Sequence, residues 1–362
     1  MPQDVAKKLL AALEKIDRPG TFCVARGVPA VLPGLIVRDV GSIALPLIPA
    51  QAEELKQQCR QAPYGKGEKT LVDTQVRRVW RMTPDRFKLA NPDWKKFLDH
   101  TVGTVQEELG LEGEQLEAHL YDLLLYEQGS FFLPHRDGEK LDRMVATLVV
   151  VLPSSYQGGE LVVRHDGHEQ TVDFSAVENG LFRVHFVAFY ADCEHEIRPL
   201  RTGHRLALVY NLTLAKSGRP IAAPRSSEHI AEIVGILHRW SQGEGADKLV
   251  VTLDHQYTQE GLAWDALKGT DRAKASVLRQ AARQAGCQAH LALLTYWQHG
   301  SAEYDGGSYG RHGRRGSGDD AAGEEHIMGE VFDSSLTADH WVDPEGNRLA
   351  LGEMPVEEQQ LV

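Results

Sequence analysis

The chain has 362 residues, of which 42% are hydrophobic and 25% are charged, as is ordinary for a soluble globular protein with more than one domain. Its net charge of −12 argues against a general binder of nucleic acid or anionic membrane, because such proteins need basic surfaces. No apolar run approaches the roughly 20 residues that cross a bilayer, so we expect no membrane segment.

The cysteines and the N-terminus indicate the compartment. The four cysteines show no CxxC spacing and look like reduced thiols; they are Cys23, Cys59, Cys193 and Cys287. The first residues place apolar side chains at helical spacing between charged ones, which is unlike a signal peptide. We expect a cytoplasmic protein.

The first third of the chain predicts helices and edge strands. A helix ends at Pro19-Gly20, and β-rich runs follow at 21–28 and 34–40. A short helix begins at Pro49, and a longer one runs from Asn91-Pro92 to Gly110 with an apolar stripe. We expect these helices to brace one face of a sheet.

The middle of the chain is dominated by β signals. The expected strands are 118–126, 144–152, 160–164, 169–174, 181–190 and 205–214, with a hairpin at Asp166-Gly167. Many short strands joined by glycine-rich turns favour a double-stranded β-helix, or jelly roll.

The last part reads as a separate unit. Helices are expected near 230–240 and 270–285, with strands at 249–253 and 289–297, and 304–325 is rich in glycine. The predicted fold class is therefore mainly β with α: a jelly roll braced by N-terminal helices, plus a smaller C-terminal α/β or α+β domain. The expected divisions are 1–115 (N-terminal helices and edge strands), 116–215 (jelly roll), 216–227 (linker), 228–300 (accessory domain) and 301–362 (glycine-rich loop and C-terminal segment).

Three side chains in the jelly-roll region suggest a metal centre. His135 and Asp137 form a His-x-Asp pair, and residues i and i+2 of a strand face the same way. His195 follows 58 positions after Asp137, from another strand. Two imidazoles and one carboxylate form the facial triad of non-haem Fe(II) enzymes. His165, His168, His185 and His204 are weaker candidates, because only His195 leads into a run that ends in Gly203-x-Arg205.

Arg205 opens an aliphatic strand, where a guanidinium is costly unless it meets an anion. The distal carboxylate of 2-oxoglutarate is such an anion, and the guanidinium fork matches it in two-point geometry.

The combined pattern resembles the 2-oxoglutarate–Fe(II) oxygenase superfamily, and within it the prolyl 4-hydroxylase-like branch. The pattern comprises His135-x-Asp137, Gly158-Gly159-Glu160-Leu161 and His195-Glu196-Ile197-x-Pro199-Leu200-x-x-Gly203-x-Arg205. The resemblance covers about residues 118 to 214. It implies that His135, Asp137 and His195 ligate Fe(II) and that Arg205 binds the C5 carboxylate of 2-oxoglutarate.

The same resemblance suggests two further contacts to the co-substrate. Tyr126 occupies the place of a tyrosine that often helps to bind 2-oxoglutarate, although a strand-end tyrosine explains it equally well. A second tyrosine of some relatives is missing from the next strand, where Thr147 is expected to supply a hydroxyl instead.

The implied activity is that of an Fe(II)- and 2-oxoglutarate-dependent dioxygenase of the EC 1.14.11 type, which uses O₂ and sometimes ascorbate. It would hydroxylate a C–H bond, first of a protein side chain such as proline and second of a small molecule, with succinate and CO₂ as co-products. Nucleic-acid and membrane partners are not expected. The alternatives are a cupin-like or Zn²⁺ metalloenzyme, since Zn²⁺ accepts the same ligands, and a non-catalytic jelly-roll binding module.

Two segments are candidates for choosing the substrate. Residues 62–88 carry seven basic and three acidic side chains, a local exception in so acidic a chain. They suit either a solvated basic surface or a segment that receives an acidic or polar substrate near the metal. The glycine-rich segment 304–325 is the second candidate.

Overall fold

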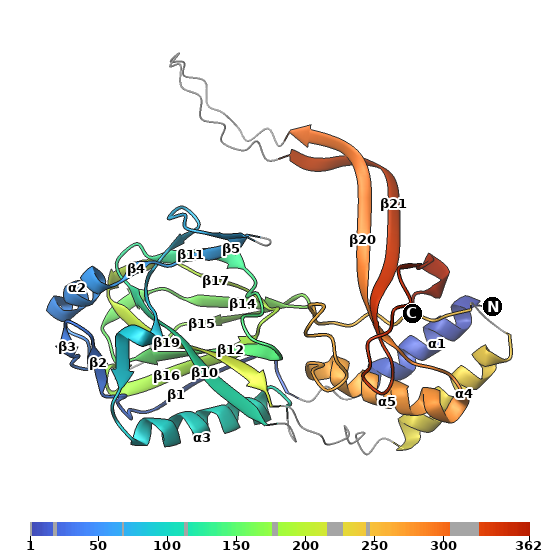
Figure 1. Ribbon diagram of the computed structural model, residues 1–362, viewed down its shortest axis with the longest axis horizontal. Coiled ribbons are helices and arrows are strands. Elements are labelled where there is room, and N and C mark those ends of the chain that lie inside the picture. The colour runs from blue at the N-terminus through green and yellow to red at the C-terminus, as the bar shows by residue number, and fades with distance from the viewer. Residues whose placement is uncertain are drawn as a thin grey trace, which may run out of the picture.

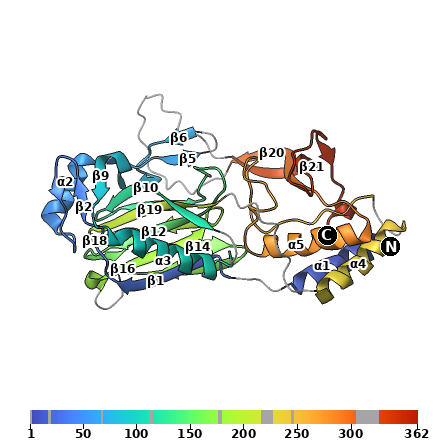
Figure 2. The same cartoon turned by 60° about the horizontal axis from the view of Figure 1, so that its bottom comes forward.

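The computed structural model describes residues 2–16, 20–66, 69–111, 115–175, 180–215, 227–243, 247–304 and 326–362. It has two parts, which Figure 1 and Figure 2 show from two sides: a sheet-rich part with helices at its margin, and a part with three helices and a long hairpin. Within the described residues, no helix has the length and apolar character that crossing a membrane requires.

A large antiparallel sheet forms the centre of the first part. In spatial order its seven strands are β1 (Cys23–Pro29), β16 (Arg183–Tyr190), β12 (Met144–Leu152), β19 (Arg205–Leu214), β10 (Leu116–Tyr126), β8 (Trp80–Met82) and β4 (Arg60–Gln61). β19 is buried at every position and β12 at all but one, as their continuous aliphatic sequence predicts.

A second antiparallel sheet has five strands. They are β15 (His168–Val172), β14 (Leu161–His165), β17 (Glu194–Ile197), β11 (Phe131–His135) and β7 (Arg77–Arg78). Smaller sheets join β13 (Tyr156–Gly158) to β18 (Leu200–Gly203), β3 (Gly41–Ser42) to β2 (Leu35–Val37) and β9 (Phe87–Leu89), and β5 (Tyr64–Lys66) to β6 (Lys69–Leu71). This mainly β architecture agrees with the predicted jelly roll.

Two helices border the large sheet. α3 (Asp93–Glu108) buries Trp94, Val102 and Val105 in the main core, and the Trp94 indole donates to the Tyr210 hydroxyl at 3.0 Å. α2 (Pro49–Gln58) buries Ala52 and Leu55 in the same core. A short 3₁₀ turn (Pro84–Arg86) precedes β9, and another (Gly180–Phe182) precedes β16.

The helix α1 (Pro2–Glu14) does not brace the sheet as predicted. Its apolar stripe, which includes Leu9 and Leu13, packs in a separate core with α4 (Ser227–Ser241) and α5 (Gly269–Ala285). Burial of an amphipathic helix needs an apolar partner surface, and α4 and α5 supply it with Ile233 and Val277. The N-terminus and the C-terminal part of the chain therefore share a core.

The C-terminal part differs from expectation in its strands. β20 (Leu291–Tyr304) and β21 (His326–Val342) form a long antiparallel hairpin with β22 (Met354–Pro355) at one edge, and a 3₁₀ turn (Glu358–Gln360) follows. The strand expected at 249–253 is wrong: it is reduced to a single bridge between Val250 and Leu361. Of the predicted linker only Ser227 is described, and of segment 304–325 only Tyr304; the rest of both lies outside the described residues.

Candidate metal centre

The structure brings His135, Asp137 and His195 together. β11 and β17 pair antiparallel with His135 opposite His195, so two residues distant in sequence become direct neighbours. Asp137 follows two residues after the end of β11. One ligand atom of each residue lies within 4.8 Å of the others, and His195 Nε2 is 3.8 Å from Asp137 Oδ2.

Backbone carbonyls fix both imidazole rings. His135 Nδ1 lies 2.8 Å from the Leu133 carbonyl oxygen, and His195 Nδ1 lies 3.1 Å from the Cys193 carbonyl oxygen. A carbonyl only accepts, so each Nδ1 carries the proton and each Nε2 keeps its lone pair. Both rings therefore have the tautomer that binds a metal through Nε2.

The electrostatics hold His135 and Asp137 in the protonation states of metal ligands. Burial, aided by the nearby His195 ring, lowers the pKa of His135 to about 3, so this ring is neutral at pH 7. Burial alone would raise the pKa of Asp137, but the two imidazoles and the Thr147 hydroxyl outweigh it and lower that pKa. Neutral imidazole beside carboxylate is the donor set of a divalent transition-metal site.

Thr147 contacts the Asp137 carboxylate. Its hydroxyl donates to Asp137 Oδ2 at 2.6 Å, from β12 on the inner face of the large sheet. This hydrogen bond orients the Asp137 carboxylate. The contact of the Thr147 hydroxyl with 2-oxoglutarate stays a prediction.

Arg205 stands where the sequence places an anion-binding residue. Its side chain is 7% exposed, and Nη1 donates to the Gly159 carbonyl at 2.6 Å. Nε is buried and has no hydrogen-bond partner, and none of the described carboxylates forms an ion pair with this guanidinium. A buried, uncompensated cation costs several kcal/mol, which an anionic ligand would offset.

Two tyrosines enclose that guanidinium. Tyr126 lies directly opposite Arg205 in the β10–β19 pairing, and its ring centroid is 4.1 Å from the guanidinium carbon. The Tyr156 ring centroid is 5.8 Å away on another side. The contact of Tyr126 with 2-oxoglutarate stays a prediction, and Tyr156 is a residue that the sequence reasoning missed.

Gly159 explains part of the glycine-rich motif. Its φ of +73° favours glycine, and a Cβ there would lie 2.7 Å from Leu200 Cδ1 and 3.3 Å from Arg205 Nη1. The second glycine of Gly158-Gly159 thus leaves room for the arginine that its carbonyl binds.

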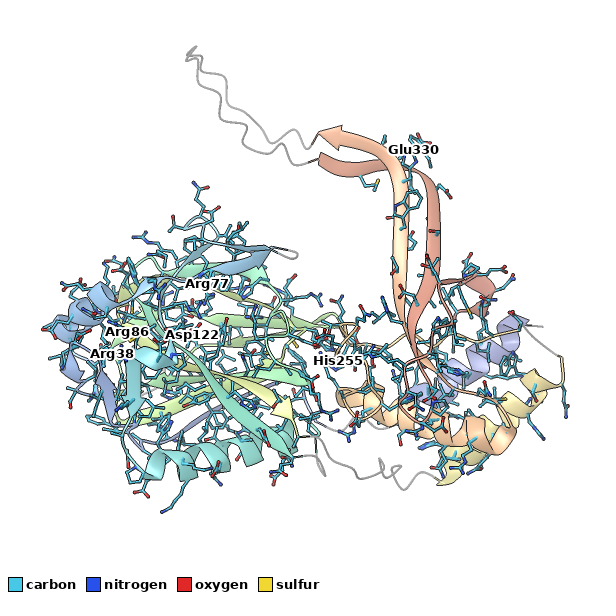
Figure 3. The ribbon with its side chains drawn as sticks, in the orientation of Figure 1. Arg38, Arg77, Arg86, Asp122, His255 and Glu330 are labelled. Atoms are coloured by element: carbon cyan, nitrogen blue, oxygen red, sulfur yellow. The ribbon has the colours of Figure 1, made fainter. Side chains whose placement is uncertain are left out.

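Arg77, labelled in Figure 3, is a half-buried cation of the basic stretch. Its guanidinium carbon lies 4.5 Å from the centroid of the Phe132 ring, which stacks on His135 at 3.4 Å. Nη1 donates to the Pro63 carbonyl at 2.6 Å, while Nε is buried without a partner. Burial lowers the pKa of Arg77, opposed by Tyr126 and Asp137. The basic stretch 62–88 had pointed to this region but not to this residue.

A second cluster, His165, Asp192 and His255, also meets the distance criterion of a metal site. Asp192 already accepts from His255 Nδ1 at 3.0 Å, from Lys268 Nζ at 3.1 Å and from the Gln256 backbone N–H at 3.0 Å. Because the Lys268 ammonium group compensates the charge of the Asp192 carboxylate, we describe this cluster as a junction of charged side chains between the two parts of the chain. Figure 3 shows His255 where the two parts of the chain meet. Sequence reasoning missed this cluster because its hydrogen-bonded pair, Asp192 and His255, is 63 positions apart in the chain.

The family described as the 2OG-Fe(II) oxygenase superfamily matches residues 121–213. No curated protein matches the chain.

Several solved structures are similar to it at low identity. A Pseudomonas putida prolyl-4-hydroxylase has 20% identity and a TM-score of 0.34, covering 57% of this chain and 98% of its own. A prolyl hydroxylase from Trichoplax adhaerens, in complex with a hypoxia inducible factor oxygen degradation domain peptide fragment, has 14% identity and a TM-score of 0.35, covering 58% and 91%. A 2OG-Fe(II) oxygenase family oxidoreductase from Burkholderia pseudomallei has 17% identity and a TM-score of 0.30, covering 58% and 90%.

The family match spans the strands that carry Tyr126, the triad and Arg205, and the sequence motifs were those of the same superfamily. Residues 121–213 therefore match the 2-oxoglutarate–Fe(II) oxygenase superfamily, a class of enzymes that uses Fe(II), 2-oxoglutarate and O₂.

Proposed function

We propose that this oxygenase hydroxylates a C–H bond of a polypeptide side chain, with proline as the first candidate. His135, Asp137 and His195 would hold Fe(II), and Arg205 would bind the C5 carboxylate of 2-oxoglutarate. The observation that carries the proposal is the buried guanidinium of Arg205, which lies on the Tyr126 ring and has no anionic partner among the described residues. A Zn²⁺ hydrolase or a metal-free binding module has no need of such a cation.

The residues of the chain prepare the site before any substrate arrives. The two carbonyl contacts set the histidine tautomers, and the Thr147 hydroxyl holds one oxygen of Asp137. Once bound, Fe(II) with 2-oxoglutarate and O₂ supplies the oxidising power, with succinate and CO₂ as co-products. Apolar side chains around Tyr126, among them Leu124 and Val209, restrict water on this side of the sheet.

The proposal of a polypeptide substrate rests on the prolyl hydroxylase-like motif of His135-x-Asp137 and His195 to Arg205. A small molecule is the second candidate.

The test is succinate formation from 2-oxoglutarate by the purified chain with Fe(II) and ascorbate, together with equilibrium binding of both. Asp137→Ala should abolish turnover. Arg205→Gln should raise the 2-oxoglutarate concentration needed for half-saturation by about 30-fold or more, because loss of a buried charge pair costs roughly 2–5 kcal/mol. Arg201→Gln, an exposed arginine paired with Glu160 at 3.1 Å, is the matched control and should behave as wild type.

Three outcomes would separate the alternatives. Equal 2-oxoglutarate binding by wild type and Arg205→Gln would refute the assigned role of Arg205. A site that binds Zn²⁺ but gives no succinate with Fe(II) would favour the metalloenzyme alternative. Absence of binding to either metal would favour the binding module.

A further inference from the structure

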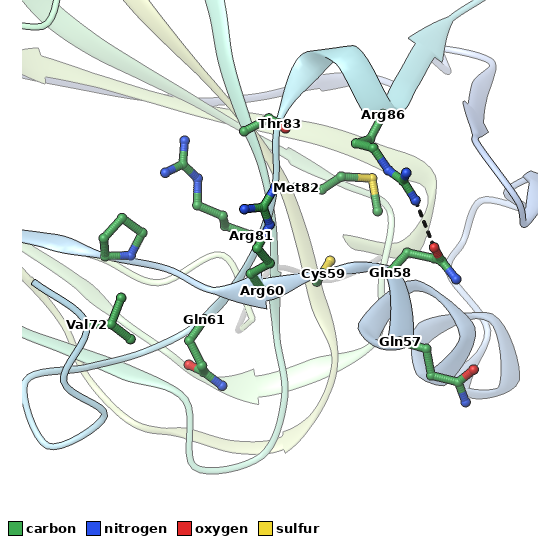
Figure 4. Close-up of a pocket in the computed structure, with 11 residues that line it drawn as sticks. Gln57, Gln58, Cys59, Arg60, Gln61, Val72, Arg81, Met82, Thr83 and Arg86 are labelled. Atoms are coloured by element: carbon green, nitrogen blue, oxygen red, sulfur yellow. Dashed lines mark hydrogen bonds between the residues drawn. The ribbon is translucent and has the colours of Figure 1, made fainter.

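A basic pocket opens beside the edge of the large sheet. It has a volume of about 540 Å³ and lies between the end of α2, the edge strand β4 and the segment from β8 to the following 3₁₀ turn (Figure 4). The polar side chains that matter for its chemistry are Gln58, Arg60, Gln61, Arg81, Thr83 and Arg86.

The charge of this pocket is the opposite of the charge of the chain. Three of its lining residues are arginines and none is acidic, in a protein of net charge −12. Arg60 is exposed and makes no side-chain hydrogen bond or ion pair within the described residues. Arg86 donates to Gln58 Oε1 at 2.9 Å (dashed in Figure 4) and lies 3.3 Å from an exposed carboxylate, that of Asp39. A surface-exposed ion pair of this kind contributes little, so Arg86 is available to a ligand anion.

The arginines need a hydrogen-bond acceptor from the ligand, whereas Gln61 needs a hydrogen-bond donor. Its Oε1 atom is buried and has no hydrogen-bond partner, so it lacks a donor. Gln61 also belongs to β4, the last strand of the seven-stranded sheet, whose outer edge pairs with no described strand. A ligand that satisfies this pocket therefore brings carboxylates for the arginines and N–H groups for the glutamine and the strand edge. An acidic stretch of polypeptide carries both.

Two arginine side chains link the surroundings of the pocket to the metal centre. Arg81 lies opposite Leu124 on β10, on the sheet face that also carries Tyr126 and Arg205. Its guanidinium binds Asp122 at 2.8 Å on that face. Arg77, four residues earlier, packs on the Phe132 ring that stacks on His135. Cationic side chains therefore run from the pocket to the neighbourhood of the triad.

We propose that this pocket binds an acidic segment of the polypeptide substrate and thereby presents a neighbouring side chain to the metal centre. The proposal rests on the proposed function, whose substrate class it narrows. It assigns Arg60 and Arg86 to substrate docking, outside the reacting centre.

The test uses the full chain and a fluorescein-labelled peptide of alternating glutamate and glycine, with the glutamine peptide of the same length as its neutral match. Fluorescence anisotropy is measured near physiological salt, where long-range attraction is screened. The glutamate peptide should bind and the glutamine peptide should not. Arg60→Gln/Arg86→Gln should weaken binding by about 10-fold or more, because hydrogen bonds to charged groups are among the stronger ones.

The matched control removes two positive charges elsewhere. Arg26→Gln/Arg239→Gln changes the net charge equally, and Arg26 is on β1, at the opposite edge of the same sheet. This variant should bind the glutamate peptide within about 2-fold of wild type, because distant exposed charges are screened. If the first double variant does not fold, Arg60→Glu alone replaces it, since Arg60 is exposed and its substitution leaves the core intact.

Each remaining outcome overturns the proposal. Equal weakening in the two double variants would mean a general charge effect, and equal binding of both peptides would remove the acidic requirement. Full displacement by inorganic phosphate at matched ionic strength would identify a small-anion site. Failure of the oxygenase function would give a different result, because wild type would bind the glutamate peptide yet form no succinate. Loss of docking alone would leave peptide-independent succinate formation by Arg60→Gln/Arg86→Gln intact.

Discussion

Replacement of Lys268 by methionine should destabilise the protein strongly, because it removes the ammonium group that compensates a buried carboxylate. The side chains of Lys268 and Asp192 are 3% and 7% exposed, and their charged atoms are 3.1 Å apart. Breaking a buried ion pair on one side costs roughly 3–5 kcal/mol. His255 and the Gln256 N–H remain on Asp192, so we expect the lower end, about 3 kcal/mol.

The measurement is equilibrium unfolding in urea, with Lys274→Met as the control. Lys274 is also a lysine of the C-terminal part that pairs with an aspartate, Asp254, at 3.3 Å, but both side chains are partly exposed. Its loss should cost less than about 1 kcal/mol. Equal destabilisation by the two substitutions would refute the reasoning.

The pH dependence supplies an internal check. Burial would raise the pKa of Asp192, but His255 and Lys268 outweigh it and hold the pKa well below its usual range. A carboxyl whose folded pKa is depressed contributes stability above its unfolded pKa, near 3.9, and loses it as the pH falls through the folded value. The difference between wild type and Lys268→Met should therefore be full at pH 7 and shrink below about pH 4.

Two further predictions concern the inner face of the large sheet. Thr147→Val removes the hydroxyl that holds Asp137 and should weaken Co²⁺ or Fe²⁺ affinity by about 10- to 100-fold. The control is Thr213→Val, which changes a buried threonine that contacts His119 and should leave the affinity unchanged. Metal titration measures both, and equal affinities of Thr147→Val and wild type would contradict the prediction. Burial raises the pKa of Asp122 to about 6, against the opposing effect of Arg81. A carboxyl whose folded pKa is raised stabilises the protein at pH values below its unfolded pKa. This stability is lost as the pH rises through the folded pKa. The stability of wild type relative to Asp122→Asn should thus fall by about 2 kcal/mol between pH 4 and pH 7, measured by urea unfolding, and a constant difference would disprove it.

The sequence predicted the parts of the site that depend on local rules. Strand alternation and the motif spacing gave His135, Asp137 and His195, which the structure brings together. Arg205 was singled out because burial of a guanidinium in an aliphatic strand costs free energy, and its side chain is indeed buried. The fold class followed from the same strand patterns.

What the sequence could not supply were partners across the chain. In the sequence, Thr147 is one residue of a predicted buried strand. Only the fold shows that its hydroxyl donates a hydrogen bond to Asp137. An apolar stripe shows that the helix 2–14 has a buried face, but not that α4 and α5 cover it. Residues 249–253 have β propensity, yet the backbone of Val250 is paired with Gln360 and Val362 at the C-terminus, so no extended ladder forms.

The junction at Asp192 has a consequence for the modularity of the oxygenase domain. The side chain of Asp192 belongs to the C-terminal part through Lys268 and His255, whereas its carbonyl accepts from Arg136, between two triad residues, at 2.8 Å. The next residue, Cys193, provides the carbonyl that orients His195. A jelly roll cut from this chain would keep the triad and the pairing of β17 with β11 and β14, but the Asp192 side chain would lose its contacts with Lys268 and His255. The turn that leads into His195 is therefore held by both parts of the chain.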